Sequence, residues 1–131
     1  MNRKVPTILV VEDDADIQVM LEEALIEAGF YPAIVAAAEE ALTLLQGAKD
    51  NYHALVSDIV LRGSMTGWEF AQLAREINPE FPVVYISGAS GADWASKGVP
   101  NSIMLQKPFA PAQLITAVSQ LINAIPPTAP A

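Results

Sequence analysis

Short apolar runs alternate five times along the chain with longer segments in which apolar residues recur every three or four positions. The runs indicate strands that are buried on both faces, and the longer segments indicate amphipathic helices. The predicted strands are Thr7–Val11, Tyr31–Val35, Ala54–Ser57, Val83–Ser87 and Ser102–Gln106. This alternation predicts an α/β fold of the (βα)5 type, a doubly wound parallel sheet with helices on both faces.

Four helices are predicted from apolar stripes at helical spacing. The stripes are Ile17, Met20, Leu21, Ala24 and Leu25; Ala38, Ala41, Leu42 and Leu45; Phe70, Leu73, Ala74 and Ile77; and Leu114, Val118, Leu121, Ile122 and Ile125. Gly29 supplies a stop for the first helix, Gly47 lies near the end of the second, and the third ends before Pro79. Residues 88–100 hold three glycines, so only a short helix is expected there, near Ala92–Lys97.

The chain has 131 residues, which is the size of one domain and long enough to bury a core. Prolines 126, 127 and 130 end the fold, so we expect one domain over residues 1–125 and a proline-rich tail over residues 126–131. Apolar residues make up 52% of the chain and charged residues only 17%, which excludes a disordered chain.

The net charge is −8, and no stretch gathers Lys or Arg. We therefore expect neither nucleic acid nor an anionic membrane surface as a partner, since both are bound through basic patches. The chain has no Cys, which excludes disulfides, thiolate zinc sites and thiol catalysis. No apolar segment is long enough to span a membrane, and we find no signal sequence, so a cytoplasmic location is expected.

Polar side chains stand where four of the predicted strands end: Glu12 and Asp13, Asp58, Ser87, and Lys107. The carboxyl ends of parallel strands meet at one edge of a sheet, so these groups should share a crevice. Carboxylates suit a hard divalent cation such as Mg²⁺, and an aspartate can accept a phosphoryl group as an acyl phosphate. The lysine would neutralise the transferred charge, and the serine hydroxyl would hydrogen-bond the phosphoryl oxygens.

In order and spacing these segments resemble response-regulator receiver domains of two-component signalling, over roughly residues 5–125. The matching segments are Ile8–Asp14, Leu55–Ile59, Gly67–Glu69, Val84–Gly88 and Leu105–Phe109. The resemblance implies that Asp58 is the phosphoacceptor. It also implies that Asp13, Asp58 and the main-chain carbonyl of Val60 bind Mg²⁺, with Glu12 helping through water.

The same resemblance implies a flavodoxin-like fold with strand order 2-1-3-4-5. Lys107 would pair with the phosphoryl group, Ser87 would be the hydroxyl that moves toward it, and the peptide bond before Pro108 would be cis. The phosphodonor would be a sensor histidine kinase or a histidine phosphotransfer protein, and the signal would pass to a downstream protein target. Relatives use the face formed by the fourth helix, fifth strand and fifth helix for dimers or targets, so a homodimer through this face and an ordinary surface are both open.

Three departures from the pattern of relatives concern regulation. Arg62 stands where many receivers have proline, and the loop that ends at Gly67 is one residue longer, as in receivers associated with hybrid sensor kinases. Met104 replaces an aromatic residue that couples to the switch hydroxyl in relatives. Val60 and Ala89 replace polar residues that orient hydrolytic water, so we expect a long-lived acyl phosphate.

We expect a stand-alone signalling domain and not an enzyme, apart from its own phosphorylation and dephosphorylation. Two alternatives remain: a pseudo-receiver that only docks, and a haloacid-dehalogenase-like phosphatase suggested by Asp14-Ala15-Asp16. Against the phosphatase, Asp14 comes three residues after the strand, where it should cap the following helix. His53 is expected to be structural or on the surface, and Trp94 either to pack on the sheet or to contact a partner.

Overall fold

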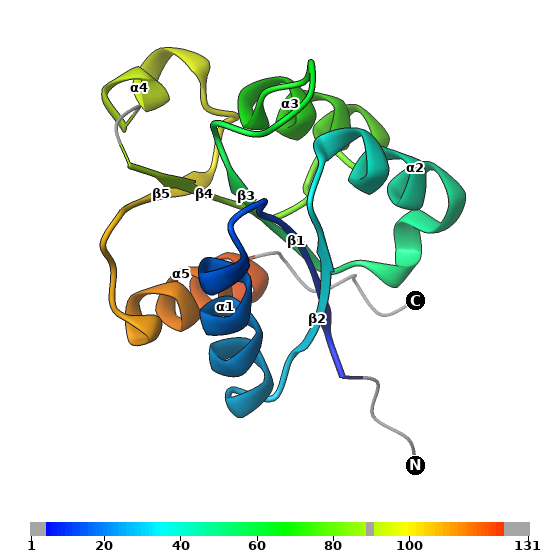
Figure 1. Cartoon of the computed structure of the whole chain (residues 1–131). Coiled ribbons are helices and arrows are strands. Elements are labelled where there is room, and N and C mark those ends of the chain that lie inside the picture. Colours follow the sequence, from blue (N-terminus) through cyan, green and yellow to red (C-terminus); the bar gives the residue numbers. More distant parts are fainter. Residues whose placement is uncertain (1–4, 89–90, 125–131) are drawn as a thin grey trace.

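A five-stranded parallel sheet forms the centre of the computed structural model, which describes residues 5–88 and 91–124. Its strands are β1 (Thr7–Val11), β2 (Tyr31–Val35), β3 (Ala54–Asp58), β4 (Val83–Ser87) and β5 (Ser102–Gln106). They are ordered β2-β1-β3-β4-β5, and every neighbouring pair is parallel (Figure 1). The flavodoxin-like fold class and strand order predicted from the sequence are confirmed.

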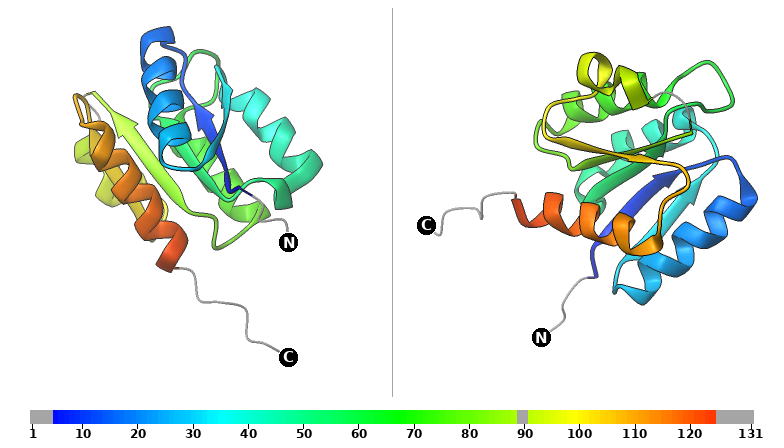
Figure 2. Two further views of the ribbon diagram at one scale, coloured as in Figure 1. Left: turned by 90° about the horizontal axis from the view of Figure 1, so that it is seen from below. Right: turned by 90° about the vertical axis from the view of Figure 1, so that its left-hand side faces the viewer.

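Helices cover both faces of the sheet (Figures 1 and 2). α1 (Ala15–Glu27) and α5 (Pro111–Ala124) lie together on one face, and α2 (Ala38–Ala48) and α3 (Gly67–Ile77) lie together on the other. In the fourth connection, residues 91–101 form a 3-10 turn and the single-turn helix α4 (Trp94–Lys97), close to the predicted short helix.

The strand residues alternate between two apolar cores. In β1, Ile8 and Val10 face the core under α1 and α5, whereas Leu9 and Val11 face the core under α2 and α3. All four are fully buried. This two-sided burial explains why the strands are continuous apolar runs in the sequence.

The ends of helices and strands near the carboxyl edge of the sheet agree with those predicted from the sequence, with one exception. Asp14 caps α1, since its Oδ1 accepts hydrogen bonds from the amides of Asp16 (2.9 Å) and Ile17 (3.1 Å). The predicted end of β3 at Ser57 is one residue too early. Asp58 still pairs in register with Ile86, because the ladder with β4 continues to this position.

The structure shows contacts for His53 and Trp94, whose roles the sequence left open. His53 Nδ1 accepts a hydrogen bond of 3.0 Å from the amide of Thr7, which is a structural role next to β1. Trp94 is 38% exposed and donates from Nε1 to Ser102 Oγ at 2.9 Å, so its ring packs partly against the edge of the sheet. A partner contact through Trp94 stays a prediction. Ile125 and the predicted tail lie outside the described residues.

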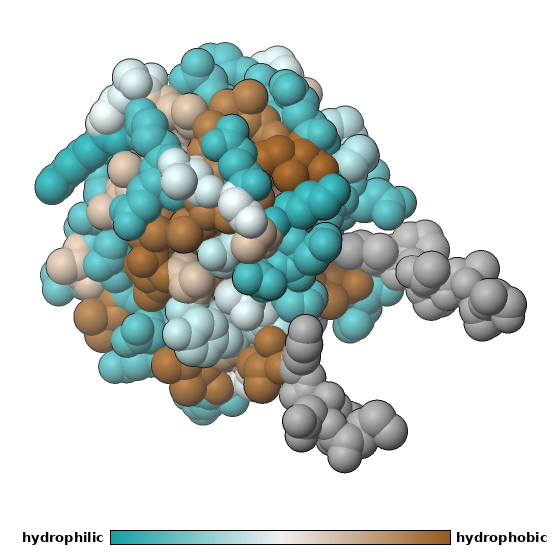
Figure 3. All heavy atoms as spheres, turned by 90° about the vertical axis from the view of Figure 1, so that its right-hand side faces the viewer, coloured by the Kyte–Doolittle hydropathy of each residue, from teal (hydrophilic) through white to brown (hydrophobic). Residues whose placement is uncertain are grey.

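Large apolar side chains on the surface are scattered over several elements. They are Val5, Val19, Ile26, Tyr31, Leu44, Val60 and Trp94. Figure 3 shows apolar and polar side chains interspersed on the side of the molecule that carries α2 and β2. Such scattered exposure is ordinary for a folded domain. Within residues 5–88 and 91–124, none of the helices has both the length and the apolar character that a membrane span requires.

Candidate functional site

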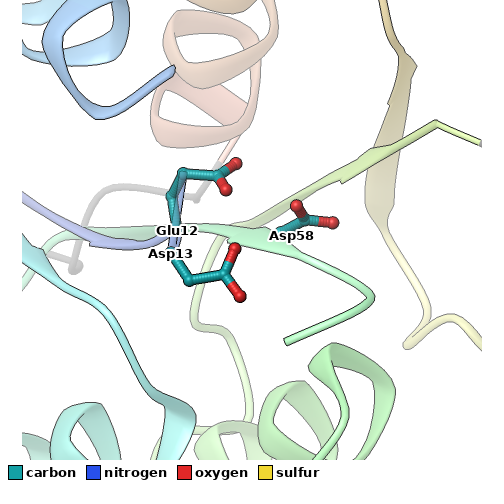
Figure 4. A group of neighbouring side chains, drawn as sticks. All are labelled: Glu12, Asp13 and Asp58. Atoms are coloured by element: carbon teal, nitrogen blue, oxygen red, sulfur yellow. The ribbon is translucent and has the colours of Figure 1, made fainter. Parts of the chain in front are cut away.

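Three carboxylates meet at the carboxyl edge of the sheet. Glu12 and Asp13 directly follow β1, and Asp58 ends the adjacent strand β3. Each offers an oxygen within 4.8 Å of the oxygens of the other two, and Figure 4 shows the side chains around a shared space. The structure therefore brings together the acids that the sequence predicted to meet.

Lys107 is the cation of this cluster. Its Nζ lies 2.8 Å from Asp58 Oδ2 and 3.5 Å from Glu12 Oε1. Burial alone would lower the pKa of Lys107, but the hydrogen bond to Asp58 and the charge of Glu12 outweigh this and raise the pKa. The ammonium therefore stays charged at neutral pH. The cis peptide bond between Lys107 and Pro108 that the resemblance implied is confirmed.

Glu12 is the most constrained of the acids, because its side chain is fully buried. Its Oε2 accepts a hydrogen bond of 3.0 Å from the Asp14 amide, while Oε1 has no hydrogen-bond partner among the described residues. The pKa of Glu12 is raised to about 7, chiefly by burial and in part by the nearby Asp58, although the hydrogen bond from the Asp14 amide lowers it. A buried carboxylate oxygen without a donor is costly unless a cation satisfies it.

The donor set fits a hard divalent cation. Only oxygen ligands are offered, and one of them, Glu12 Oε1, accepts no hydrogen bond in the described part of the chain and has only the ion pair of 3.5 Å with Lys107. Asp13 is partly exposed, so an ion could enter from solvent. The Val60 amide donates to Asp58 Oδ1 at 3.2 Å, which places this residue beside the acids. The role of the Val60 carbonyl as a ligand stays a prediction.

Ser87 lies on β4, the strand next to Asp58, and Met104 lies one strand further, on β5. Ser87 ends β4 and is buried, and its carbonyl accepts a hydrogen bond of 2.8 Å from the Lys107 amide. Met104 is half-buried on β5, directly opposite Tyr85 of β4. The structure thus brings Ser87 to the same edge as the acids, and its role as a switch hydroxyl stays a prediction.

Sequence reasoning missed Tyr85. The ring is fully buried and lies 4.7 Å from the Trp68 ring, centroid to centroid. Its hydroxyl accepts a hydrogen bond of 3.0 Å from the amide of Val99, which follows α4. An aromatic residue therefore does stand in the core next to Met104, but on the neighbouring strand. The sequence gives one indication of this role, namely a tyrosine within an aliphatic run, two positions before Ser87.

Sequence reasoning also missed Glu39 of α2. Its Oε2 accepts hydrogen bonds from the Ser64 amide (3.2 Å), the Ser64 hydroxyl (3.1 Å) and the Met65 amide (3.2 Å). These bonds hold the long loop between β3 and α3. At the other side of the loop, the Arg62 amide donates to Asp13 Oδ2 at 3.2 Å. In the sequence, Glu39 looks like an ordinary acid in the first turn of a helix.

The geometry does not favour the phosphatase alternative. Asp14, the first acid of its motif, is exposed, and its Oδ1 is engaged by the amides of Asp16 and Ile17 at the start of α1. Among the described residues, the group of three acids that could hold a metal includes neither Asp14 nor Asp16.

Glu12→Gln tests the cost of the buried carboxylate. The pKa of Glu12 is raised from 4.5 to about 7, so between these values the folded state holds more protons than the unfolded state. The free energy of unfolding of the metal-free protein therefore falls as the pH rises through this window. We expect Glu12→Gln to raise it by about 1 to 2 kcal/mol at pH 8, with the gain vanishing near pH 4.

Urea unfolding at several pH values in a chelator measures this effect. Added Mg²⁺ should stabilise the wild type more than the variant, because glutamine supplies no charge to the cation. If Glu12→Gln is less stable than the wild type at pH 8 without metal, the buried carboxylate does not destabilise the fold and the prediction is wrong.

Comparison with known proteins agrees with this geometry. Residues 8–119 match the family described as the response regulator receiver domain. The response regulator receiver protein CpdR of Brucella abortus (strain 2308) is 30% identical over 119 residues, which cover 89% of this chain and 97% of that protein. The crystal structure of a response regulator receiver protein from Sinorhizobium medicae WSM419 is similar, with 45% identity and a TM-score of 0.89, covering 92% of this chain and 97% of that one.

Other relatives are much longer than this chain. It spans only 28% of the two-component response regulator ARR14 of Arabidopsis thaliana, with 29% identity over 109 residues that cover 82% of this chain. The match thus concerns the receiver part of such proteins. The family match covers most of the sequence, and the fold and the acids at the edge of the sheet agree with it. The chain therefore belongs to the response regulator receiver domain family of two-component signalling.

Proposed function

We propose that this receiver accepts a phosphoryl group on Asp58 from a sensor histidine kinase or a histidine phosphotransfer protein. The observation that carries the proposal is the contact of the Asp58 carboxylate with Lys107 Nζ at 2.8 Å, beside two further acids, one of which has a buried oxygen that accepts no hydrogen bond among the described residues. Mg²⁺ would be held by Asp13, Asp58 and the carbonyl of Val60, with Glu12 acting through water.

The transfer requires positioning and charge neutralisation rather than a base. An Asp58 oxygen forms the bond to phosphorus while the bond from phosphorus to the donor imidazole nitrogen breaks, and the electron pair stays on that nitrogen. Bound Mg²⁺ would neutralise charge on the phosphoryl oxygens. Lys107 already contacts Asp58, so its ammonium can follow the phosphoryl group without a large movement. The hydroxyl of Ser87 would hydrogen-bond a phosphoryl oxygen.

We place the docking of the phosphodonor protein beside Lys107. Ile17 and Met20 of α1 line a shallow hollow together with Lys107, Pro108 and Phe109. A helix of the donor protein that fills this hollow would bring its phosphohistidine next to Asp58. Because a histidine kinase takes its phosphoryl group from ATP, this transfer would occur in the cytoplasm.

The output would use a different face. Ile103 and Leu105 on the edge strand β5 form a half-buried groove with Ala112 and other residues of α5. Phosphorylation adds charge at one crevice and would bias the conformation of this face, which we propose binds a downstream protein or a second copy of the chain. No part of this proposal requires nucleic acid or a membrane.

One experiment tests the function. The protein is incubated with acetyl phosphate or phosphoramidate, with Mg²⁺ or with a chelator, and the modified residue is mapped after borohydride reduction. We expect labelling of Asp58 only with Mg²⁺. Absence of labelling would favour a pseudo-receiver that only docks, and labelling of Asp14 would favour the phosphatase. Light scattering before and after labelling tests the homodimer.

The acyl phosphate should decay slowly. Val60 lies at the mouth of the crevice and is 70% exposed, and its apolar side chain cannot orient a hydrolytic water. Ala89, the second residue of this prediction, lies outside the described residues. We expect Val60→Asn to shorten the half-life of the acyl phosphate about three- to tenfold, because an amide can position water near phosphorus. Loss of the label over time measures the half-life, and an unchanged decay in Val60→Asn would contradict the prediction.

A further inference from the structure

The loop between β3 and α3 is fixed by a side chain from a third element. Glu39 of α2 receives three hydrogen bonds on one oxygen, from the main chain and hydroxyl of Ser64 and the main chain of Met65. Hydrogen bonds from its own amide and from Ser64 lower the pKa of Glu39, so the carboxylate is charged at neutral pH. The loop is therefore anchored to a helix and does not depend on its own residues alone.

The backbone of the loop is shaped to this anchor. Gly63 has a φ of +99°, which residues with a side chain rarely adopt. A Cβ at this position would lie 3.1 Å from Glu39 Oε1, so the glycine also makes room for the carboxylate. The extra residue of the loop is thus accommodated by a defined turn, and the residue before the turn, Arg62, acquires a defined position.

That position is the mouth of the phosphoacceptor crevice. The Arg62 amide donates to Asp13 Oδ2 at 3.2 Å, and its Nε lies 3.6 Å from the same oxygen. In residues 5–88 and 91–124, Arg62 and Lys107 are the cations that pair with the three crevice acids. They differ in access to solvent: the side chain of Arg62 is 85% exposed and that of Lys107 only 25%.

The two cations are therefore suited to different steps. Lys107 is held between Asp58 and Glu12, inside the crevice. Arg62 faces solvent, where an anionic phosphodonor arrives, and a guanidinium can bind two phosphoryl oxygens at once. A divalent cation on Asp13 would weaken the ion pair with Arg62 and leave more of the guanidinium's donors for the phosphodonor.

We propose that Arg62 is a phosphodonor-binding residue at the mouth of the crevice and that Glu39, by anchoring the loop, is its positioning residue. This inference rests on the proposed phosphorylation of Asp58. It assigns a function to the lengthened loop: the loop supplies a second, exposed cation for the incoming phosphoryl group.

The test measures the rate of labelling by a fixed, subsaturating concentration of acetyl phosphate with saturating Mg²⁺. We expect Arg62→Ala to lower the rate about five- to tenfold and Arg62→Lys to restore it to within about twofold. Rescue by lysine distinguishes a charge contact from a merely structural role. A matched control is Lys97→Ala, since Lys97 also has an ion pair of 3.6 Å, with Asp93, but on α4, and its rate should not change.

Glu39 is tested through Arg62. Glu39→Ala should lower the rate about threefold in the wild type but have no further effect in Arg62→Ala, because its action passes through that side chain. Glu40→Ala, which removes a neighbouring exposed acid of the same helix, is the control for the change in net charge. Thermal unfolding of each variant verifies that it is folded at the assay temperature.

A second measurement does not depend on labelling. Calorimetric titration should show that Mg²⁺ binds Arg62→Ala about two- to threefold more tightly than the wild type. The reason is that the variant lacks the guanidinium that competes with Mg²⁺ for Asp13. A wild type that is not labelled at all would overturn the proposed function together with this inference. A wild type that is labelled, with the same rate in Arg62→Ala, would overturn this inference alone.

Discussion

Replacing Asp58 by asparagine is expected to abolish Mg²⁺-dependent phosphorylation while the fold stays intact. The amide has nearly the same shape as the carboxylate but is a poor nucleophile toward phosphorus, so no stable phosphoryl adduct forms. Lys107 keeps Glu12 as a partner, which limits the disturbance of the crevice. Mass spectrometry after incubation with acetyl phosphate measures the loss, and circular dichroism verifies the fold.

Asp14→Asn is the matched control. Asparagine caps a helix as well as aspartate, so α1 should be unaffected, and labelling should remain at the level of the wild type. Full labelling of Asp58→Asn together with loss of labelling in Asp14→Asn would refute the assignment of the phosphoacceptor. The pair of variants thus separates the receiver chemistry from the phosphatase alternative.

Gly67→Ala is expected to be the most destabilising single-methyl change near the site. A Cβ on this first residue of α3 would lie 2.2 Å from the Asp58 carbonyl oxygen and 2.8 Å from Ile59 Cα. Both are main-chain atoms of the segment that carries the phosphoacceptor, and Gly67 also donates to the Ile59 carbonyl at 2.9 Å. Relief of the overlap must move α3 away from β3, which we expect to cost about 3 kcal/mol or more.

The chain offers a control of the same kind for this change. Gly47 lies within α2, and a Cβ there would meet no atom within 4 Å. We expect Gly47→Ala to raise the free energy of unfolding by about 0.5 to 1 kcal/mol, because alanine is the better helix former. Urea unfolding of both variants measures the difference, and a Gly67→Ala protein as stable as the wild type would show that the close approach is not required.

The elements that the sequence predicted well are those with local signals. Each strand is an unbroken apolar run, and each long helix shows a stripe that the structure places against the sheet, as Leu21 and Leu25 of α1 do. The cap at Asp14 was predicted from its position before such a stripe and is confirmed. The fourth connection has no such stripe, and its described residues form a 3-10 turn and one turn of α-helix.

The acids of the site were also predictable, because strand ends are readable in the sequence and parallel strands end at one edge. The burial and protonation of each acid could not be predicted in the same way. Glu12 follows β1 like its neighbour Asp13, yet Glu12 is fully buried with an oxygen that lacks a hydrogen bond, while Asp13 is partly exposed. The difference arises from the side to which each side chain points at the end of the strand, and the burial of Glu12 raises its pKa.

By itself the sequence determined the doubly wound sheet, its strand ends and the residue types gathered there, because hydrophobic periodicity and chain order specify these features. Only the tertiary structure decided that Glu39 anchors the loop that carries Arg62, and that Tyr85 fills the core beside Met104 and holds the amide of Val99. Glu39 lies 25 positions from Ser64, and such contacts depend on how the backbones of separate elements pass one another. Periodicity reports which face of an element is buried, but not which distant side chain meets it.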